Sequence, residues 1–220
     1  ELSFGCPAGL RTATPTVLRG SPIVTPPNSA NGFGYAVALG DLRAGTNQQL
    51  TRDVVVLGQR TGQTESDHSE VAVLFGDNSA NGVPGTQRAT LVICPEGTPW
   101  RVVPKQVLVM DADSDLEADI LVASAEDLPL PPPPDLIPAR TVGGFIDIFF
   151  GPIDPGLVYT NGAVSGQNCE ANIPGSLGDA QVTRLRTTAA EASDYRFGAV
   201  MAAAALQDPV VGLHWLATIN

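Results

Sequence analysis

Short runs of apolar, mostly β-branched residues recur along the chain, and residues that favour turns bound each run. Residues 54–57 (Val-Val-Val-Leu) follow Asp53, and residues 120–123 (Ile-Leu-Val-Ala) follow Asp119. Runs of this length are typical of buried β-strands. The chain also holds 23 glycines and 19 prolines among 220 residues, so turns are frequent. The pattern predicts an all-β chain of many short strands.

The strand pattern repeats with a period of about 70 to 75 residues. Strand-like segments end in Phe-Gly at Phe4, Phe75 and Phe150, and the two separations are nearly equal. A second landmark agrees with the first, because the apolar segment 36–41 aligns with 106–111, about one period further along. Both segments end in an aspartate. Two independent landmarks therefore indicate an internal repeat.

Each repeat contains an inner apolar strand, an aspartate turn, a second apolar strand, a third strand that ends in Phe-Gly, and a more polar stretch. A fourth strand is expected in that stretch, at residues 90–93 in one unit and 181–185 in the next. Four short antiparallel strands per period are typical of a β-propeller blade. We therefore expect a β-propeller, or a fragment of one, with about three repeats.

The repeat divides a single domain, or part of one, into four stretches. The expected boundaries are 1–31 for the end of a preceding blade and a linker, 32–105 for a blade, 106–195 for a blade with a proline-rich insertion at 131–134, and 196–220 for the start of a further blade. Two alternatives stay open for the incomplete unit. Residues 1–18 close it, or the missing strands belong to other sequence or another chain, and we favour the fragment.

The segment Gly32-Phe33-Gly34-Tyr35-Ala36-Val37-Ala38-Leu39-Gly40-Asp41 resembles the FG-GAP repeat of integrin α-subunit propellers and of many bacterial secreted proteins. Residues 196–202 (Arg-Phe-Gly-Ala-Val-Met-Ala) resemble the start of a further such unit. The unit around Val107 departs from the pattern, because it lacks the Phe-Gly opening. The resemblance covers nearly the whole chain and implies a calcium-binding propeller.

In that family the turn after the inner strand often reads D-x-[DN]-x-D-G-x-x-D and binds calcium. This chain has Asp111-Ala112-Asp113-Ser114-Asp115-Leu116-Glu117-Ala118-Asp119 at that place. The resemblance implies a Ca²⁺ site with side-chain ligands from four aspartates and a backbone carbonyl ligand from a fifth residue: Asp111, Asp113, Asp115, Asp119 and, by its carbonyl, Glu117. Calcium takes about 6 to 8 oxygen ligands, so alternating carboxylates in a tight turn suit it.

Three observations bear on that site. An EF-hand is excluded, because the twelfth position is Val122 and strands flank the loop. Leu116 stands where the family usually has glycine, which costs on the order of 1 kcal/mol if the position needs a positive φ. The alternative is a solvated acidic turn without an ion. The corresponding turns after Asp41 and near Asp208 have lost the acidic pattern, and we expect no metal there.

Composition restricts the partners and the location. The net charge is −11, so nucleic acid is not expected as a partner. The sequence has no apolar run of about 18 residues, so no membrane insertion is expected either. Location outside the cytoplasm, secreted, extracellular or periplasmic, fits calcium binding.

Cys94 and Cys169 occupy equivalent positions in neighbouring units, because Cys94 follows Phe75 at the same distance as Cys169 follows Phe150. Equivalent positions are one whole unit apart, so a disulfide between these two cysteines is disfavoured. Pairing of Cys6 with either of them, or buried free thiols, remains open.

No catalytic constellation is evident, and we expect no enzyme activity. Asp67, His68 and Ser69 are adjacent in sequence and cannot orient one another as a triad requires. His214 and Trp215 fit a packed strand. The expected function is therefore a non-enzymatic calcium-binding module that binds a protein or a glycan, as in adhesion. The alternatives are a structural subunit of a larger extracellular assembly, with other chains completing the propeller, and the scaffold part of a secreted hydrolase.

Overall fold

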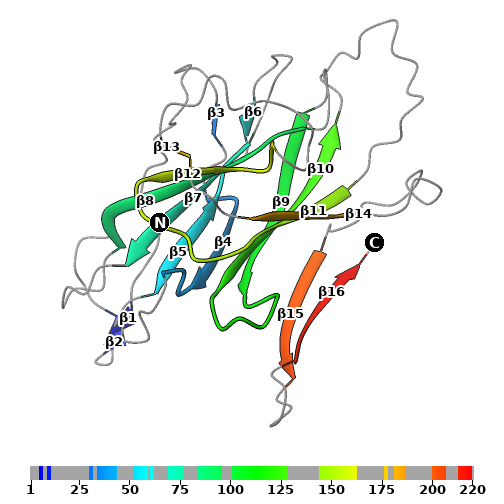
Figure 1. Cartoon of the computed structure of the whole chain (residues 1–220). Coiled ribbons are helices and arrows are strands. Elements are labelled where there is room, and N and C mark those ends of the chain that lie inside the picture. The colour runs from blue at the N-terminus through cyan, green and yellow to red at the C-terminus, as the bar shows by residue number, and fades with distance from the viewer. Residues whose placement is uncertain are drawn as a thin grey trace, which may run out of the picture.

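The computed structural model confirms an all-β chain. It describes residues 5–6, 9–10, 30–31, 34–43, 52–58, 60–61, 69–76, 84–95, 101–127, 144–162, 176–177, 181–186, 200–206 and 213–219, and the elements assigned there are all strands (Figure 1). In that part of the chain we find no helix that is long and apolar enough to cross a membrane.

The first repeat forms an antiparallel sheet in sequence order. Its strands are β4 (Ala36–Gly40), β5 (Asp53–Leu57), β7 (Ser69–Gly76) and β8 (Pro84–Ile93), and each pairs with the next. The strand expected at 90–93 is thus confirmed as the end of β8. Two strands extend this sheet beyond β8 in the parallel sense, β12 (Leu157–Thr160) and β13 (Ser176–Leu177).

The second repeat forms a separate antiparallel sheet with the same order of strands. Its strands are β9 (Arg101–Met110), β10 (Asp119–Asp127), β11 (Gly144–Phe149) and β14 (Val182–Arg186). The strand expected at 181–185 is confirmed as β14. β9 begins earlier than the expected residue 106, because a β-bulge lets Gln106 and Pro104 both pair with β10. β9 is an edge strand, where a proline is tolerated.

Two hairpins and one pair of strands that are distant in sequence complete the described strands. β1 (Gly5–Cys6) pairs with β2 (Gly9–Leu10), and β3 (Ala30–Asn31) pairs with β6 (Arg60–Thr61). β15 (Val200–Leu206) pairs with β16 (Leu213–Ile219), as expected for the first two strands of a third unit. His214 and Trp215 lie on β16, so the expected strand there is confirmed.

The two sheets pack against each other across one hydrophobic core. Both contribute buried side chains, among them Val55, Val73 and Phe75 from the first sheet and Ile120 and Phe149 from the second. β4 contacts β9, and β9 contacts β15 on its other side (Figure 1). A second, smaller cluster lies between the second sheet and Met201 of β15. The first strands of the three units, β4, β9 and β15, therefore lie next to one another in repeat order.

Gly40 is required where β4 meets β9. A Cβ at this position would overlap the side chain of Val109. Only a residue without a side chain lets the two strands approach this closely. The small residues Ala36 and Ala38 pack against the same core from β4. The contact surface that β4 presents to the second repeat therefore consists of small residues.

β12 is a strand that the sequence analysis missed. Residues 157–160 (Leu-Val-Tyr-Thr) follow the Phe-Gly of the second unit, yet they pair with β8 of the first. The crossing is fixed by Ile153, which is fully buried and whose N–H donates to the carbonyl oxygen of Leu42 at 2.9 Å. The segment 152–162 thus ties the second unit to the first.

Cys94 is disulfide-bonded, so the free-thiol alternative is wrong for this residue. The side chain of its partner lies outside the described residues. Several other expectations also fall outside them: the strand residues 2–4, the pair Asp67 and His68, the prolines 131–134, Cys169, the Phe-Gly of residues 197–198, and Asp208.

Candidate functional site

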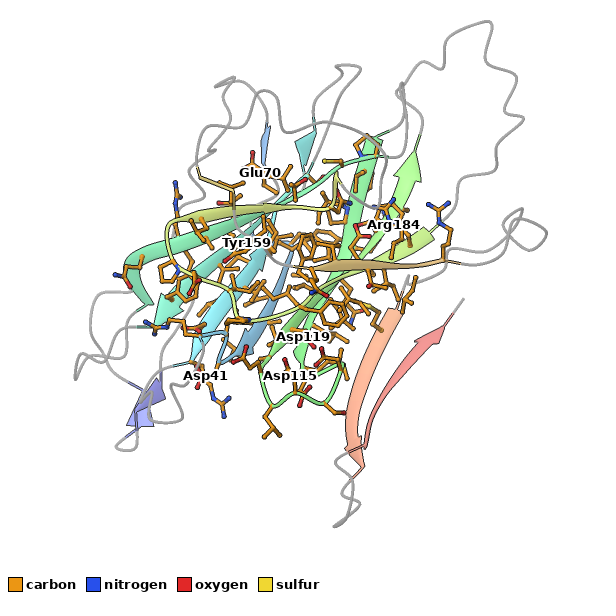
Figure 2. The ribbon with its side chains drawn as sticks, in the orientation of Figure 1. Asp41, Glu70, Asp115, Asp119, Tyr159 and Arg184 are labelled. Carbon is orange, nitrogen blue, oxygen red and sulfur yellow. The ribbon has the colours of Figure 1, made fainter. Side chains whose placement is uncertain are left out.

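The acidic turn joins β9 to β10 at one end of the second sheet. Asp111 follows the last residue of β9 and Asp119 is the first residue of β10. Figure 2 shows Asp115 and Asp119 at this end of the sheet, with Asp41 at the same end of the neighbouring sheet. The two sheets therefore present their equivalent turns on the same side of the molecule.

The turn brings three of the predicted ligands together. One carboxylate oxygen from each of Asp111, Asp113 and Asp115 lies within 4.8 Å of the others. Oxygens on opposite sides of a calcium ion, each at about 2.3 to 2.6 Å, are about 4.6 to 5.2 Å apart. The spacing in the turn therefore fits one cation in contact with all three carboxylates.

Backbone N–H groups hold these carboxylates in place. Asp111 accepts hydrogen bonds from the N–H of Ser114 at 2.7 Å and of Leu116 at 3.1 Å. Asp115 accepts one from the N–H of Glu117 at 2.8 Å, and Asp113 accepts one from the N–H of Asp115 at 3.2 Å. Each carboxylate oxygen has a second lone pair, so these bonds leave room for a cation. The turn is thus arranged by its own backbone.

Leu116 has φ 75° and Ser114 has φ 70°, both in the left-handed region. Position 116 does take a positive φ, so the condition stated for the cost of a leucine there is met. Its side chain is 93% exposed, so no packing offsets the strain. Leucine in this conformation costs on the order of 1 kcal/mol relative to glycine. The strain is tolerated because both residues donate their N–H groups to Asp111.

Asp119 lies apart from the three-carboxylate cluster and closes the turn. It is fully buried, and its two oxygens accept hydrogen bonds from the N–H of Ala112 at 2.6 Å and of Gly151 at 2.9 Å. Burial raises the pKa of Asp119 above its ordinary value of 3.8, and the charges of Asp113 and Asp115 raise the pKa further, although the two N–H donors oppose this shift. Its predicted role as a ligand stays a prediction.

Glu117, whose backbone carbonyl was the fifth expected ligand, is half-buried in the turn. The backbone leaves little space beside it, because a Cβ on Gly151 would come within 2.7 Å of the carbonyl oxygen of Ala118. Glycine is therefore required after the Phe of the second unit, where the third strand passes under the turn.

The first repeat contains the same structure without the acidic cluster. Asp53 is fully buried and accepts hydrogen bonds from the N–H of Leu42 at 2.9 Å and of Gly76 at 2.8 Å. These donors correspond to Ala112 and Gly151 in the second repeat. Asp53 and Asp119 are thus equivalent residues that join the inner turn to the Phe-Gly strand.

The two repeats differ in the charge beside this aspartate. In the first, the guanidinium of Arg43 lies 3.6 Å from Asp53 and donates to the carbonyl oxygen of Gly76 at 2.6 Å. The alignment of 36–41 with 106–111, continued along both segments, matches Arg43 with Asp113. One repeat therefore supplies a cation of its own, whereas the other supplies carboxylates at the same place. This alignment was available in the sequence, but only the structure shows that Arg43 contacts Asp53.

Asp53 makes the stability of the protein depend on pH. Burial raises the pKa of Asp53 above 3.8, against the opposing N–H groups of Leu42 and Gly76 and the charge of Arg43. As pH falls, the folded state therefore takes up a proton at Asp53 before the unfolded state does. The resulting contribution to the free energy of unfolding is fully present below pH 3.8 and is lost as pH rises through the folded pKa.

We expect the free energy of unfolding of the wild type, minus that of Asp53→Asn, to decrease as pH rises from about 4 to neutrality. Urea denaturation of both proteins at a series of pH values measures this difference, in which the other carboxylates cancel. A difference that increases with pH would contradict the raised pKa.

Comparison of the chain with protein-family models, with curated proteins and with solved structures gave no match.

Proposed function

We propose that the protein is an extracellular calcium-binding β-propeller module of the FG-GAP type, which binds a protein or a glycan and has no catalytic activity. The observation that carries the proposal is the contrast between the two repeats. Asp53 has the guanidinium of Arg43 beside it, whereas its equivalent Asp119 faces Asp113 and Asp115. A bound cation would balance the negative charge of these carboxylates, as the guanidinium of Arg43 balances the charge of Asp53.

Calcium suits the donors in this turn. The converging groups are all carboxylate oxygens, which calcium and other hard cations prefer. When bound, the ion would be held by Asp111, Asp113 and Asp115, with Asp119 and the carbonyl of Glu117 as the further ligands that the resemblance implies. Its role is to stiffen the end of the sheet where the equivalent turns gather.

The order of the strands supports a propeller. Each repeat contributes four strands that pair antiparallel in sequence order, the first repeat within a six-stranded sheet, and the two sheets share one hydrophobic core. The first strands β4, β9 and β15 lie next to one another in repeat order. Innermost strands that succeed one another around a central axis are what a propeller requires. Exposed turns at one end of such sheets are a usual place for ligand binding.

The disulfide at Cys94 supports a location in an oxidising compartment. Calcium reaches millimolar concentration outside the cell, where a site of modest affinity is occupied. The net charge of −11 suits a soluble partner better than a phosphate backbone. These features agree with a secreted, extracellular or periplasmic binding module.

The proposal is tested by thermal unfolding with calcium and with excess chelator. A ligand at 100 times its Kd adds about 2.7 kcal/mol of stability, which raises the Tm of a protein of this size by about 5 to 10 °C. We expect the wild type to show this rise and Asp113→Asn to lose most of it. Asp41→Asn, at the position that matches Asp111 in the turn where we expect no metal, should keep the full rise. A wild type whose Tm ignores calcium would contradict the site.

A second candidate function is that of a structural subunit in a larger extracellular assembly. The outer face of β4 favours it, because Tyr35, Val37 and Leu39 are 57%, 42% and 63% exposed. Adjacent exposed apolar side chains mark interaction surfaces. The test of this candidate is the association state of the purified chain, measured by sedimentation.

A further inference from the structure

The outer face of β4 is apolar and exposed. Val37 and Leu39 of β4, and Tyr35 just before the strand, alternate with Ala36 and Ala38, which pack against the core. Successive side chains of a strand point to opposite faces, so these three apolar side chains lie on the face that points away from the second sheet. That leaves the innermost strand of the first repeat with one covered face and one uncovered face.

The second repeat shows what covers the equivalent face. In the alignment of 36–41 with 106–111, Val37 and Leu39 correspond to Val107 and Val109. Val107 is only 3% exposed, and Val109 lies against Gly40. In the second repeat this face is thus covered by the small residues of the preceding first strand, Ala36, Ala38 and Gly40.

The third unit repeats this register. When the Phe-Gly pairs at 33–34 and 197–198 are aligned, Val37 matches Met201 of β15, which is 3% exposed and packs on the second sheet. The side-chain amide of Gln106 pairs with both backbone groups of Met201, at 2.7 and 2.5 Å. The same alignment matches Ala38 and Gly40 with Ala202 and Ala204. β15 therefore carries small residues at the positions that cover an apolar face in the contact between β4 and β9.

We propose that two copies of this chain associate head to tail, with the outer face of β4 of each copy packed against the β15–β16 hairpin of the other. The inference rests on the proposed propeller arrangement and goes beyond it. The two surfaces repeat, between chains, the contact that joins β4 to β9 within one chain. A contact between two different surfaces closes into a ring when the rotation fits. The described part of each copy supplies the four strands of each of two repeats and the two-stranded β15–β16 hairpin.

The association is tested by sedimentation velocity of the whole chain at micromolar concentration. We expect a mass of twice 22.8 kDa for the wild type. Val37→Arg would bury an unpaired charge in the contact, and we expect it to weaken association by at least about 30-fold. Leu185→Arg is the matched control, because Leu185 is a 37% exposed leucine on the edge strand β14, and it should remain a dimer.

Three controls keep the outcome interpretable. Circular dichroism checks that Val37→Arg is folded, and Tyr35→Arg, at the more exposed end of the same face, replaces it if it is not. Val37→Arg should keep the calcium-dependent rise in Tm, so failure of the dimer and failure of the calcium site are separate results. A wild type that is monomeric, or a folded Val37→Arg or Tyr35→Arg that dimerises as the wild type does, overturns the proposal.

Discussion

Asp147→Ala is expected to lower the free energy of unfolding by about 3 to 5 kcal/mol, because it leaves a buried guanidinium without its counterion. Asp147 on β11 is fully buried, and the side chain of Arg184 on β14 is 4% exposed. The guanidinium donates to the two carboxylate oxygens at 2.7 and 2.9 Å. Figure 2 shows Arg184 on the second sheet. Urea denaturation of wild type and variant at neutral pH measures the loss.

The same carboxylate also links the two sheets. The side-chain amide of Asn161 donates to Asp147 at 2.6 Å, while its oxygen accepts the N–H of Cys94 at 2.7 Å. Arg184 in turn stacks over the ring of Phe145, with 3.7 Å between the guanidinium carbon and the ring centre. The pair therefore lies at a junction of β11, β14 and the end of β8.

A double variant separates a buried charge from lost packing. Asp147→Leu combined with Arg184→Leu removes both charges, and we expect it to recover most of the stability that Asp147→Ala loses. A double variant as unstable as the single one would show that the stability depends on the network itself. An Asp147→Ala protein within about 1 kcal/mol of the wild type would contradict the burial of the pair.

Asp53→Ala is expected to lower the free energy of unfolding by about 2 to 5 kcal/mol, because two buried N–H groups lose their acceptor. These N–H groups belong to Leu42 and Gly76, at 2.9 and 2.8 Å from the carboxylate. Arg43 loses its ion-pair partner in the same change. Thermal and urea unfolding of the variant without calcium measure the effect, which does not involve the acidic turn.

Asp53→Asn is the matched control for this prediction. It keeps the size of the side chain and one acceptor oxygen, so we expect an intermediate loss of stability. If Asp53→Ala and Asp53→Asn were equally stable, the hydrogen bonds to Leu42 and Gly76 would contribute little. In that case, the hydrogen-bond arrangement that Asp53 shares with Asp119 would not add measurably to the free energy of unfolding.

The acidic turn shows which parts of the candidate site can be predicted from local sequence. The spacing of Asp111, Asp113 and Asp115 is enough to bring their oxygens together, because a single tight turn contains all three. The sequence also showed a leucine where the family usually has glycine, but only the structure shows that position 116 has a positive φ. Asp119 behaves differently. Its carboxylate is engaged by Gly151, a residue 32 positions away, so its structural role depends on how the third strand returns beneath the turn.

The sequence by itself determined the all-β class, the repeat and the order of strands within each unit. Those features follow from local preferences, since short apolar runs, Phe-Gly ends and aspartate turns act over a few neighbouring residues. They placed β5, β8, β10 and β14 correctly.

Only the tertiary structure decided which distant residues meet. The parallel pairing of β12 with β8, the pairing of Asp147 with Arg184 and the contact of Arg43 with Asp53 each join residues that are well separated along the chain. Such contacts depend on how whole sheets pack. The fit between two packed surfaces depends on both of them, so the local sequence of one strand does not determine it. The exposure of the outer face of β4 has the same origin, because Val37 and Leu39 match Val107 and Val109 of β9 and only the packing distinguishes the two pairs.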